Sequence, residues 1–254
     1  MRGKVIGIVS PKGGVGKTTI ASSLGAFLAR EHDQSAILAD MNFHTPNVFH
    51  YLGLNRHPEL TPNLRKLIER NSMHVEACCS HSSGLHVVPS FADLSGETTF
   101  DVDELRKNLD SLRKTYDYIL LDSPPGFNKT VKQVLGVSDD VIIVTTPDSP
   151  SVLSTAGAID LANSLNSKHH VVVNKTTGHK HEMHSSEIED LLGSKVISEI
   201  PFEFNVMTSA FRGVPAVEQS RNFKKNIGQI SEKITGLSYA EESRLRRLLG
   251  FFSH

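Results

Sequence analysis

The segment at residues 10–19, SPKGGVGKTT, restricts the possible folds of this chain more than any other stretch of its sequence. It follows a short apolar run at residues 5–9 and leads into a helical pattern over residues 18–30. Its glycines allow a tight turn that directs backbone N–H groups inward, and the following helix presents its positive end to the same point. The segment therefore predicts a strand, an anion cradle and a helix, in that order.

Short apolar runs alternate with helical stretches along the rest of the chain. Most of these runs are nearly continuous, as in strands that are buried on both faces. The expected strands are at residues 5–9, 36–38, 85–88, 118–121, 141–145, 171–173 and 196–200, and the expected helices include residues 18–30, 63–70, 102–114 and 152–164. This alternation predicts right-handed crossovers and an α/β fold: a single doubly wound, mostly parallel sheet with helices on both faces.

Length and composition favour a single domain. The chain has 254 residues, and no Pro/Ser/Gly-rich linker, internal repeat or low-complexity stretch divides it. We therefore expect one P-loop domain over residues 1–237, followed by a distinct segment at residues 238–254. The formal net charge of −1 offers no general attraction for nucleic acid, so nucleic acid is not an expected partner.

The cysteines and the N-terminal residues predict a cytoplasmic location. Cys78 and Cys79 are adjacent and form no CxxC pair, which fits a reducing compartment and argues against a disulfide scaffold or a Cys-ligated metal centre. The apolar part of MRGKVIGIVS is too short for a signal peptide, and no run approaches the ~20 apolar residues that span a bilayer. If the chain meets a membrane, we expect it to lie on the surface.

Two side chains of the cradle have the chemistry that a nucleotide phosphate needs. Lys17 is expected to reach the β- and γ-phosphates, and the Thr18 hydroxyl to ligate Mg²⁺. Pro11 departs from the general G-x-x-x-x-G-K-[ST] pattern, which has glycine at that position. The predicted ligands are ATP and Mg²⁺, and the loop residues predicted to bind the nucleotide are Lys12, Gly13, Gly14, Val15, Gly16, Lys17, Thr18 and Thr19.

Lys12 narrows this prediction to one class of ATPase. PKGGVGKTT resembles the deviant Walker A motif, K-G-G-x-G-K-[ST]-T, of the MinD/ParA family, most closely its MinD-like members, and the supporting loops extend the resemblance over most of residues 4–220. The resemblance implies that Lys12 reaches across a homodimer interface to the phosphates of the ATP bound by the other subunit. A flexible ammonium can neutralise charge that develops during phosphoryl transfer.

Asp122 ends the apolar run YDYILL and precedes SPPG. A carboxylate at a strand's carboxyl end next to the cradle is what a Walker B aspartate requires, because Mg²⁺ takes oxygen ligands and keeps several waters. The segment DSPPGFNKT also resembles the switch II of the family, in which Pro124, Pro125 and Gly126 form a stiff hinge that senses the γ-phosphate.

Asp40 and Asn42 occupy the positions of the family's D-x-D pattern, after the apolar run at residues 36–38. Asp40 is a candidate catalytic residue and Mg²⁺ ligand. Asn42 departs from the pattern, because an amide can hydrogen-bond a water but cannot accept its proton. We therefore expect slow hydrolysis unless a partner stimulates it, or a water positioned by Asp40. The alternatives are a capped turn without a catalytic part and a binding module without turnover.

Two later strand ends resemble the base-binding part of the family. Asn174, in VVVNKTTG, looks like the asparagine whose side-chain amide reads the adenine edge. Pro201 and Phe202 open the segment at residues 201–205, which resembles the loop that flanks the base with its backbone. Both predictions follow from the resemblance.

The C-terminal sequence EESRLRRLLGFFSH predicts a basic amphipathic helix. Its apolar side would carry Leu245, Leu248, Leu249, Phe251 and Phe252. This arrangement resembles the membrane-targeting helix of MinD-like proteins and predicts binding to an anionic membrane surface, on the inner face of the cell membrane. The alternative is a last helix packed on its own domain.

These features together predict a MinD-like ATPase switch. ATP would drive dimerisation, the dimer would bind the membrane and an unidentified activating protein, and hydrolysis would release both, for positioning in cell division or of a polar structure. The alternatives are a ParA-type partition ATPase that binds DNA non-specifically and an Mrp-like carrier ATPase. The carrier should have a C-terminal CxxC, which this sequence lacks.

Overall fold

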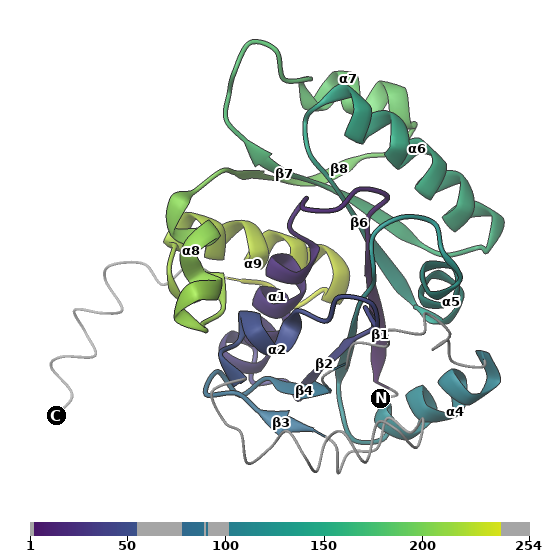
Figure 1. Ribbon diagram of the computed structural model, residues 1–254, viewed down its shortest axis with the longest axis vertical. Helices are drawn as coiled ribbons and strands as arrows, with labels where there is room; N and C mark the ends of the chain where they lie inside the picture. The colour runs from purple at the N-terminus through teal and green to yellow at the C-terminus, as the bar shows by residue number, and fades with distance from the viewer. Residues whose placement is uncertain (1–2, 55–77, 89, 91–101, 240–254) are drawn as a thin grey trace, which may run out of the picture.

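A computed structural model of the chain describes residues 3–54, 78–88, 90 and 102–239. In this part, eight strands form one sheet in the order β3-β4-β2-β5-β1-β6-β7-β8 (Figure 1). The strands are β1 (Lys4–Val9), β2 (Ala36–Asp40), β3 (Cys79–Ser80), β4 (His86–Val88), β5 (Tyr118–Asp122), β6 (Asp140–Thr145), β7 (His169–Thr176) and β8 (Val196–Pro201). All neighbouring strands are parallel except the pair of β3 and β4. The predicted doubly wound α/β fold is confirmed.

Each predicted strand overlaps an observed one, because long apolar runs identify strands that are buried on both faces. The strands β2 and β5 run on to Asp40 and Asp122, so that both carboxylates stand at the carboxyl edge of the sheet. The sequence did not predict β3, whose two residues are too few for a periodic pattern. A turn that closes with a hydrogen bond from the Gly84 N–H to the His81 carbonyl joins β3 to β4.

The described helices are α1 (Lys17–Glu31), α2 (Val48–Tyr51), α4 (Val102–Leu112), α5 (Lys129–Val137), α6 (Ser149–Ser164), α7 (Ser185–Leu192), α8 (Phe204–Arg212) and α9 (Arg221–Thr235), with a short 3₁₀ helix η3 (Ala216–Glu218). The helices predicted at residues 18–30, 102–114 and 152–164 are present as α1, α4 and α6. The prediction for 102–114 is two residues too long, and α6 begins three residues earlier than predicted because Asp148 caps it. The helix predicted at residues 63–70 lies outside the described residues.

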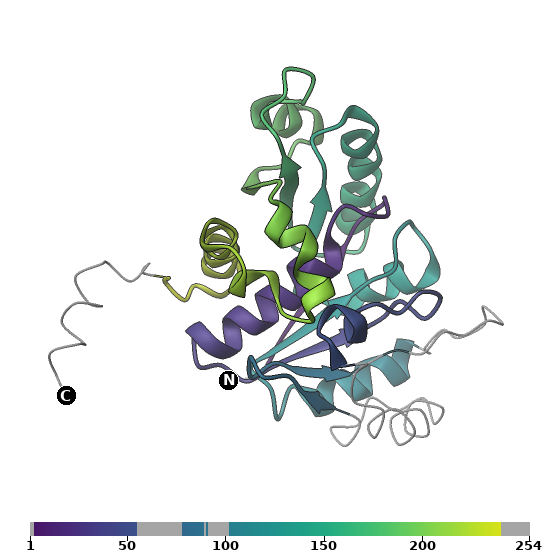
Figure 2. The same cartoon turned by 60° about the vertical axis from the view of Figure 1, so that its left-hand side comes forward.

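Helices cover both faces of the sheet (Figure 2). On one face, α1, α2 and α9 pack on the sheet around large buried side chains such as Phe27 and Phe223. On the other face, α4, α5, α6 and α7 enclose a second apolar cluster. No helix within the described ranges is long and apolar enough to cross a membrane.

The ends of α2 and α8 meet through two glycines. A Cβ atom built on Gly53 would lie 2.9 Å from the Gly213 Cα, and one built on Gly213 would lie 2.6 Å from the Gly53 Cα. Both glycines also have positive φ, 66° and 69°. The backbones of these two helix ends are therefore in direct contact.

A buried carboxylate, Asp140, holds together the amino edge of the sheet. Lys4 approaches it to 2.6 Å, Lys168 to 3.0 Å and the Nε2 atom of His170 to 2.6 Å. Burial alone would raise the pKa of Asp140, but hydrogen bonds from His170, Lys4 and Lys168 lower it well below its ordinary value. The starts of β1, β6 and β7 thus share one ionic cluster.

Candidate functional site

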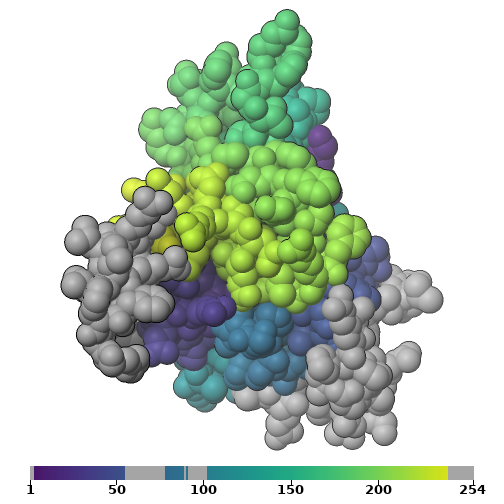
Figure 3. All heavy atoms as spheres, turned by 90° about the vertical axis from the view of Figure 1, so that its left-hand side faces the viewer, coloured from purple at the N-terminus to yellow at the C-terminus, as the bar shows by residue number. Residues whose placement is uncertain are grey.

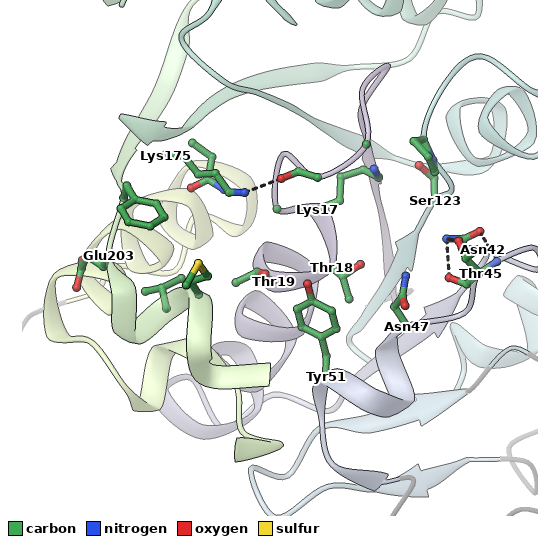
Figure 4. A pocket seen from close by; sticks show the side chains of 18 of the residues that line it. Lys17, Thr18, Thr19, Asn42, Thr45, Asn47, Tyr51, Ser123, Lys175 and Glu203 are labelled. Atoms are coloured by element: carbon green, nitrogen blue, oxygen red, sulfur yellow. Dashed lines mark hydrogen bonds between the residues drawn. The ribbon is translucent and has the colours of Figure 1, made fainter. Parts of the chain in front are cut away.

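A pocket of about 370 Å³ opens at the carboxyl edge of the sheet (Figure 4). The loops after β1, β2 and β5, the ends of β7 and β8, and the helices α1, α2 and α8 supply its walls, as expected for a ligand site in a sheet of this kind. The lining residues are Gly13, Gly14, Gly16, Lys17, Thr18, Thr19, Asn42, Thr45, Asn47, Tyr51, Ser123, Pro125, Asn174, Lys175, Pro201, Phe202, Glu203, Val206 and Met207. Of the predicted loop residues, all but Lys12 and Val15 line this pocket, together with Asn42, Asn174, Pro201 and Phe202.

The glycine loop has the backbone shape that a phosphate cradle needs. Gly14 and Gly16 have φ angles of 76° and 102°, which other residues adopt only with strain. Helix α1 begins at Lys17, so its unpaired N–H groups and positive end face the pocket. The Lys17 side chain is largely buried, which lowers its pKa, and the charge of Asp122 partly offsets this effect.

Asp122 lies beneath this loop in an unusual environment for a carboxylate. Its Oδ2 atom accepts a hydrogen bond from the Thr18 hydroxyl at 2.6 Å, while its Oδ1 atom is buried and has no hydrogen-bond partner in the described part of the chain. Burial, together with the charge of Asp40, raises the pKa of Asp122 to about 7. A buried carboxylate oxygen without a partner, beside a threonine hydroxyl, fits Mg²⁺, which prefers oxygen ligands.

Asp40 closes a turn between β2 and α2. Its Oδ1 atom accepts from the Asn42 N–H at 2.9 Å, and its Oδ2 atom accepts from the N–H groups of Asn47 and Val48 at 2.9 and 3.1 Å. Burial raises the pKa of Asp40 to about 6, although these three hydrogen bonds act in the opposite direction. The carboxylate therefore stabilises the turn and the start of α2, as in the alternative interpretation. Its roles in catalysis and metal binding stay predictions.

Asn42 stands at the pocket wall, but its amide is engaged within the same turn. Its Nδ2 atom donates to the carbonyl and to the hydroxyl of Thr45 at 2.9 and 3.0 Å, and its Oδ1 atom accepts from the Thr45 N–H at 3.2 Å. To position a water, the side chain would have to exchange one of these contacts. Its catalytic role also stays a prediction.

Lys12 points away from the pocket and contacts the start of α6. Its ammonium lies 3.0 Å from Asp148 Oδ1 and 2.9 Å from the Ser151 hydroxyl, and its side chain is 49% exposed. Burial alone would raise the pKa of Asp148, but hydrogen bonds from Thr146, Ser151 and Lys12 lower it below its ordinary value. The two lysines of the loop therefore lie in different environments. Lys17 lines the pocket, and Lys12 belongs to a polar cluster at the surface with Asp148 and Ser151.

The predicted switch segment after β5 touches the phosphate loop. Pro125 lines the pocket, and the Gly126 N–H donates to the Ser10 carbonyl at 3.0 Å. The Ser123 N–H donates to the Ile8 carbonyl at 3.1 Å, which continues the pairing of β5 with β1. This segment and the loop are therefore coupled through their backbones.

Asn174 lies closer to the phosphate loop than a purely base-reading residue needs to. Its Nδ2 atom donates to the Val15 carbonyl at 2.7 Å, and the side chain is buried. Sequence reasoning missed Tyr51, Lys175 and Met207 in the pocket wall. Lys175 could have been noticed as the next residue after a strand-end asparagine, whereas nothing local distinguishes Tyr51 or Met207.

The predicted membrane residues Leu245, Leu248, Leu249, Phe251 and Phe252 lie outside the described residues. The described chain ends at Tyr239, whose ring packs at 4.8 Å on that of Phe27. Cys78 and Cys79 form no disulfide in the described part of the chain.

Comparison with known proteins agrees with this geometry. The AAA domain family matches residues 3–178. An uncharacterized ATP-binding protein of Methanocaldococcus jannaschii is 27% identical over 219 residues, which cover 86% of this chain and 82% of the relative. The septum site-determining protein MinD of Thermotoga maritima is 25% identical over 244 residues, covering 92% and 89%.

Solved structures show the same similarity. The MinC:MinD cell division protein complex of Aquifex aeolicus contains a chain that superimposes with a TM-score of 0.79 at 25% identity, covering 94% of this chain and 98% of that one. MinD of Pyrococcus horikoshii, complexed with Mg-ADP, gives a TM-score of 0.80 at 20% identity, covering 91% and 96%. The second similarity concerns the fold alone.

Proposed function

Since the chain belongs to the AAA domain family and, within it, to the MinD/ParA ATPases, we propose that it is a MinD-like switch. In this proposal ATP drives homodimerisation, and the dimer binds a membrane surface and an activating partner. Hydrolysis then releases both, which gives spatial control in cell division or of a polar structure. Magnesium binding, dimerisation and membrane binding are parts of this proposal, and each can be tested separately.

The different positions of Lys12 and Lys17 carry the proposal. Lys17 is buried in the pocket, whereas the Lys12 ammonium is held by Asp148 outside it. A lysine in that place adds little to the charge around a nucleotide in its own pocket. It is, however, exposed enough to leave Asp148 and reach a nucleotide in a second subunit.

The pocket residues divide the work of phosphoryl transfer among them. Lys17 and the loop N–H groups would bind the phosphates, Thr18 and Asp122 would hold Mg²⁺, and Asn42 would orient the attacking water. When bound, the ion supplies positive charge that stabilises the phosphate oxygens. Because Asn42 cannot take the water's proton, turnover is slow until a partner completes the site.

The dimer is tested by comparing Lys17→Ala with Lys12→Ala. Isothermal titration and size-exclusion chromatography are carried out with ADP, ATP and a non-hydrolysable ATP analogue. Lys17→Ala should lose nucleotide binding, because it removes the main cation of the cradle. Lys12→Ala should keep most ATP affinity while losing dimerisation and turnover, and Lys180→Ala, an exposed lysine outside the pocket, serves as control. Equal loss of affinity in both loop variants would contradict a role of Lys12 in the second subunit.

The membrane part of the proposal concerns residues 238–254, as a targeting helix on the cytoplasmic face of the membrane. Helices α8 and α9 lie on one face of the molecule, and α9 is the last helix of the described chain (Figure 3). One such helix binds weakly, but two on an ATP dimer turn the second insertion into an intramolecular event that raises avidity by about 10²–10⁴.

Liposome sedimentation with ADP, ATP and the analogue tests the membrane step. Anionic vesicles should retain the ATP form, high salt should weaken the binding, and deletion after Ser238 should abolish it. A parallel sedimentation with DNA tests the ParA-type alternative. Binding that is equal with ADP and ATP, or that survives Leu248→Glu with Phe252→Glu, would contradict the targeting helix.

A further inference from the structure

Two consecutive side chains at the end of β7 donate hydrogen bonds to the phosphate loop. The Asn174 Nδ2 atom donates to the Val15 carbonyl at 2.7 Å. The Lys175 ammonium donates to the Gly14 carbonyl at 2.6 Å (Figure 4). Gly14 and Val15 are consecutive residues of the loop, so two neighbouring carbonyls accept hydrogen bonds from β7.

Peptide geometry gives these two contacts a consequence for ligand binding. In a trans peptide the carbonyl and the following N–H point in opposite directions. When Lys175 holds the Gly14 carbonyl, the Val15 N–H must point away from Lys175. When Asn174 holds the Val15 carbonyl, the Gly16 N–H is fixed in the same manner. These N–H groups belong to the segment that must converge on an anion, and a glycine-rich loop relaxes most easily by rotating such peptides.

Lys175 on β7 and Gly16 in the phosphate loop each have a backbone feature that fits the contact between β7 and the loop. Lys175 has a φ of 63°, a left-handed conformation that is strained for a lysine and is kept only where surrounding contacts impose it. A Cβ atom built on Gly16 would lie 2.3 Å from Asn174 Nδ2, so this close approach needs a glycine in the loop. The strain and the close approach both occur where β7 meets the loop.

We propose that Asn174 and Lys175 are positioning residues that hold the phosphate loop in its anion-binding form by orienting two consecutive peptides. Asn174 then contributes to phosphate affinity, in addition to or in place of the adenine recognition that the family resemblance implies. Lys175 acts through the loop rather than by direct contact with the phosphates. The inference rests on the proposed nucleotide binding.

Pyrophosphate, which has no base, separates the two roles of Asn174. Affinities for pyrophosphate, ADP and GDP are measured by isothermal titration for the wild type, Asn174→Ala and Lys175→Met, with Lys180→Met as the matched control. We expect pyrophosphate and ADP affinities to fall together, about tenfold in each loop-contact variant, because one hydrogen bond that orders a charged site is lost. The control should be unchanged. If Asn174→Ala weakens ADP and leaves pyrophosphate unchanged, the residue reads the base and the proposal is wrong for it.

Two further variants separate positioning from diffuse charge and from general stability. Lys175→Arg keeps a cationic donor and should retain most pyrophosphate affinity. Lys175→Gly relieves the left-handed strain, so its Tm should equal or exceed that of the wild type while its pyrophosphate affinity falls. A Lys175→Met loss that vanishes at high salt would mean that only charge matters, and it would overturn the proposal for Lys175. A wild type that binds neither ADP nor pyrophosphate would instead contradict the proposed function.

Discussion

Each edge of the sheet buries a carboxylate at the end of a central strand, Asp140 at the amino edge and Asp122 at the carboxyl edge, and their electrostatic environments are opposite. At the amino edge, Asp140 is contacted by Lys4, Lys168 and His170, and its pKa is lowered. At the carboxyl edge, Asp122 has one oxygen without a partner among the described residues, and its pKa is raised to about 7. Both side chains are almost inaccessible to solvent. Two carboxylates with equally low solvent exposure therefore have pKa values shifted in opposite directions.

The difference separates a structural site from a functional one. A buried charge costs free energy unless opposite charges and hydrogen bonds compensate it. The amino edge supplies that compensation within the chain. The carboxyl edge supplies only part of it, through the Thr18 hydroxyl and the charge of Lys17, so a cation that arrives from outside would relieve the remaining unfavourable charge.

The largest effect is expected from Asp140→Asn, which removes the charge that compensates Lys4 and Lys168 and that lies 2.6 Å from His170 Nε2. Breaking a buried ionic cluster costs about 3 kcal/mol, with some relief here because Lys168 is well exposed. Urea denaturation should show a lower midpoint with an unchanged m-value. Asp160→Asn, at an exposed position, provides the control. A loss as small as the control's would mean that both edges are equally tolerant.

The converse change at the other edge is Asp122→Asn. Removing a buried charge that Thr18 and Lys17 compensate only in part should raise the stability of the ligand-free protein by roughly 2 kcal/mol at pH 8, since a shifted pKa is a difference in free energy between folded and unfolded states. The same variant should lose the additional stabilisation by Mg²⁺ with a non-hydrolysable ATP analogue, measured as a Tm shift. A variant that is less stable than the wild type without ligand would contradict the comparison.

Asn42→Asp sharpens the comparison by adding a third carboxylate near Asp40 and Asp122. If Asn42 stands at the catalytic position, single-turnover hydrolysis should rise at least about tenfold, because a carboxylate can accept the water's proton. The ligand-free protein should lose about 1 kcal/mol of stability, because the new carboxylate cannot donate to Thr45. Rapid-quench assays measure the rate. An unchanged or lower rate would mean that another group orients the water.

The smallest effect is the acid dependence of the amino edge. Because the pKa of Asp140 is lowered on folding, its contribution to stability is complete above about pH 4 and is lost as the pH falls toward the lowered value. The free energy of unfolding, measured with urea at pH 5, 4 and 3, should therefore decline more steeply for the wild type than for Asp140→Asn, by about 1 kcal/mol. Parallel declines would assign the acid sensitivity to other carboxylates.

Sequence reasoning succeeded where the chemistry is local. Lys17 and Thr18 stand in one continuous motif, and Asp122 ends a long apolar run, so strand, turn and carboxylate could be predicted together. The turn at Asp40 was predicted as an alternative for the same reason, because Asn42 and Asn47 lie a few residues away.

Contacts between distant segments could not be predicted. Asp148 lies 136 residues from Lys12, and Asn174 lies 159 residues from Val15. The ionic cluster at the amino edge was missed because charged residues at strand starts normally face solvent. Only the order of the strands brings Lys4, Asp140 and His170 together, and no local pattern encodes that order.

The contact between Gly53 and Gly213 limits how this chain can diverge. Tyr51 on α2 and Met207 on α8 line the pocket. Because the backbones of Gly53 and Gly213 touch with no side chain between them, this contact sets how closely α2 and α8 approach each other. Any other residue at either position would act as a wedge and force α2 from α8. Substitutions elsewhere in α2 and α8 would change the chemistry of the pocket wall, whereas glycine at both positions is what allows the two helix ends to approach this closely.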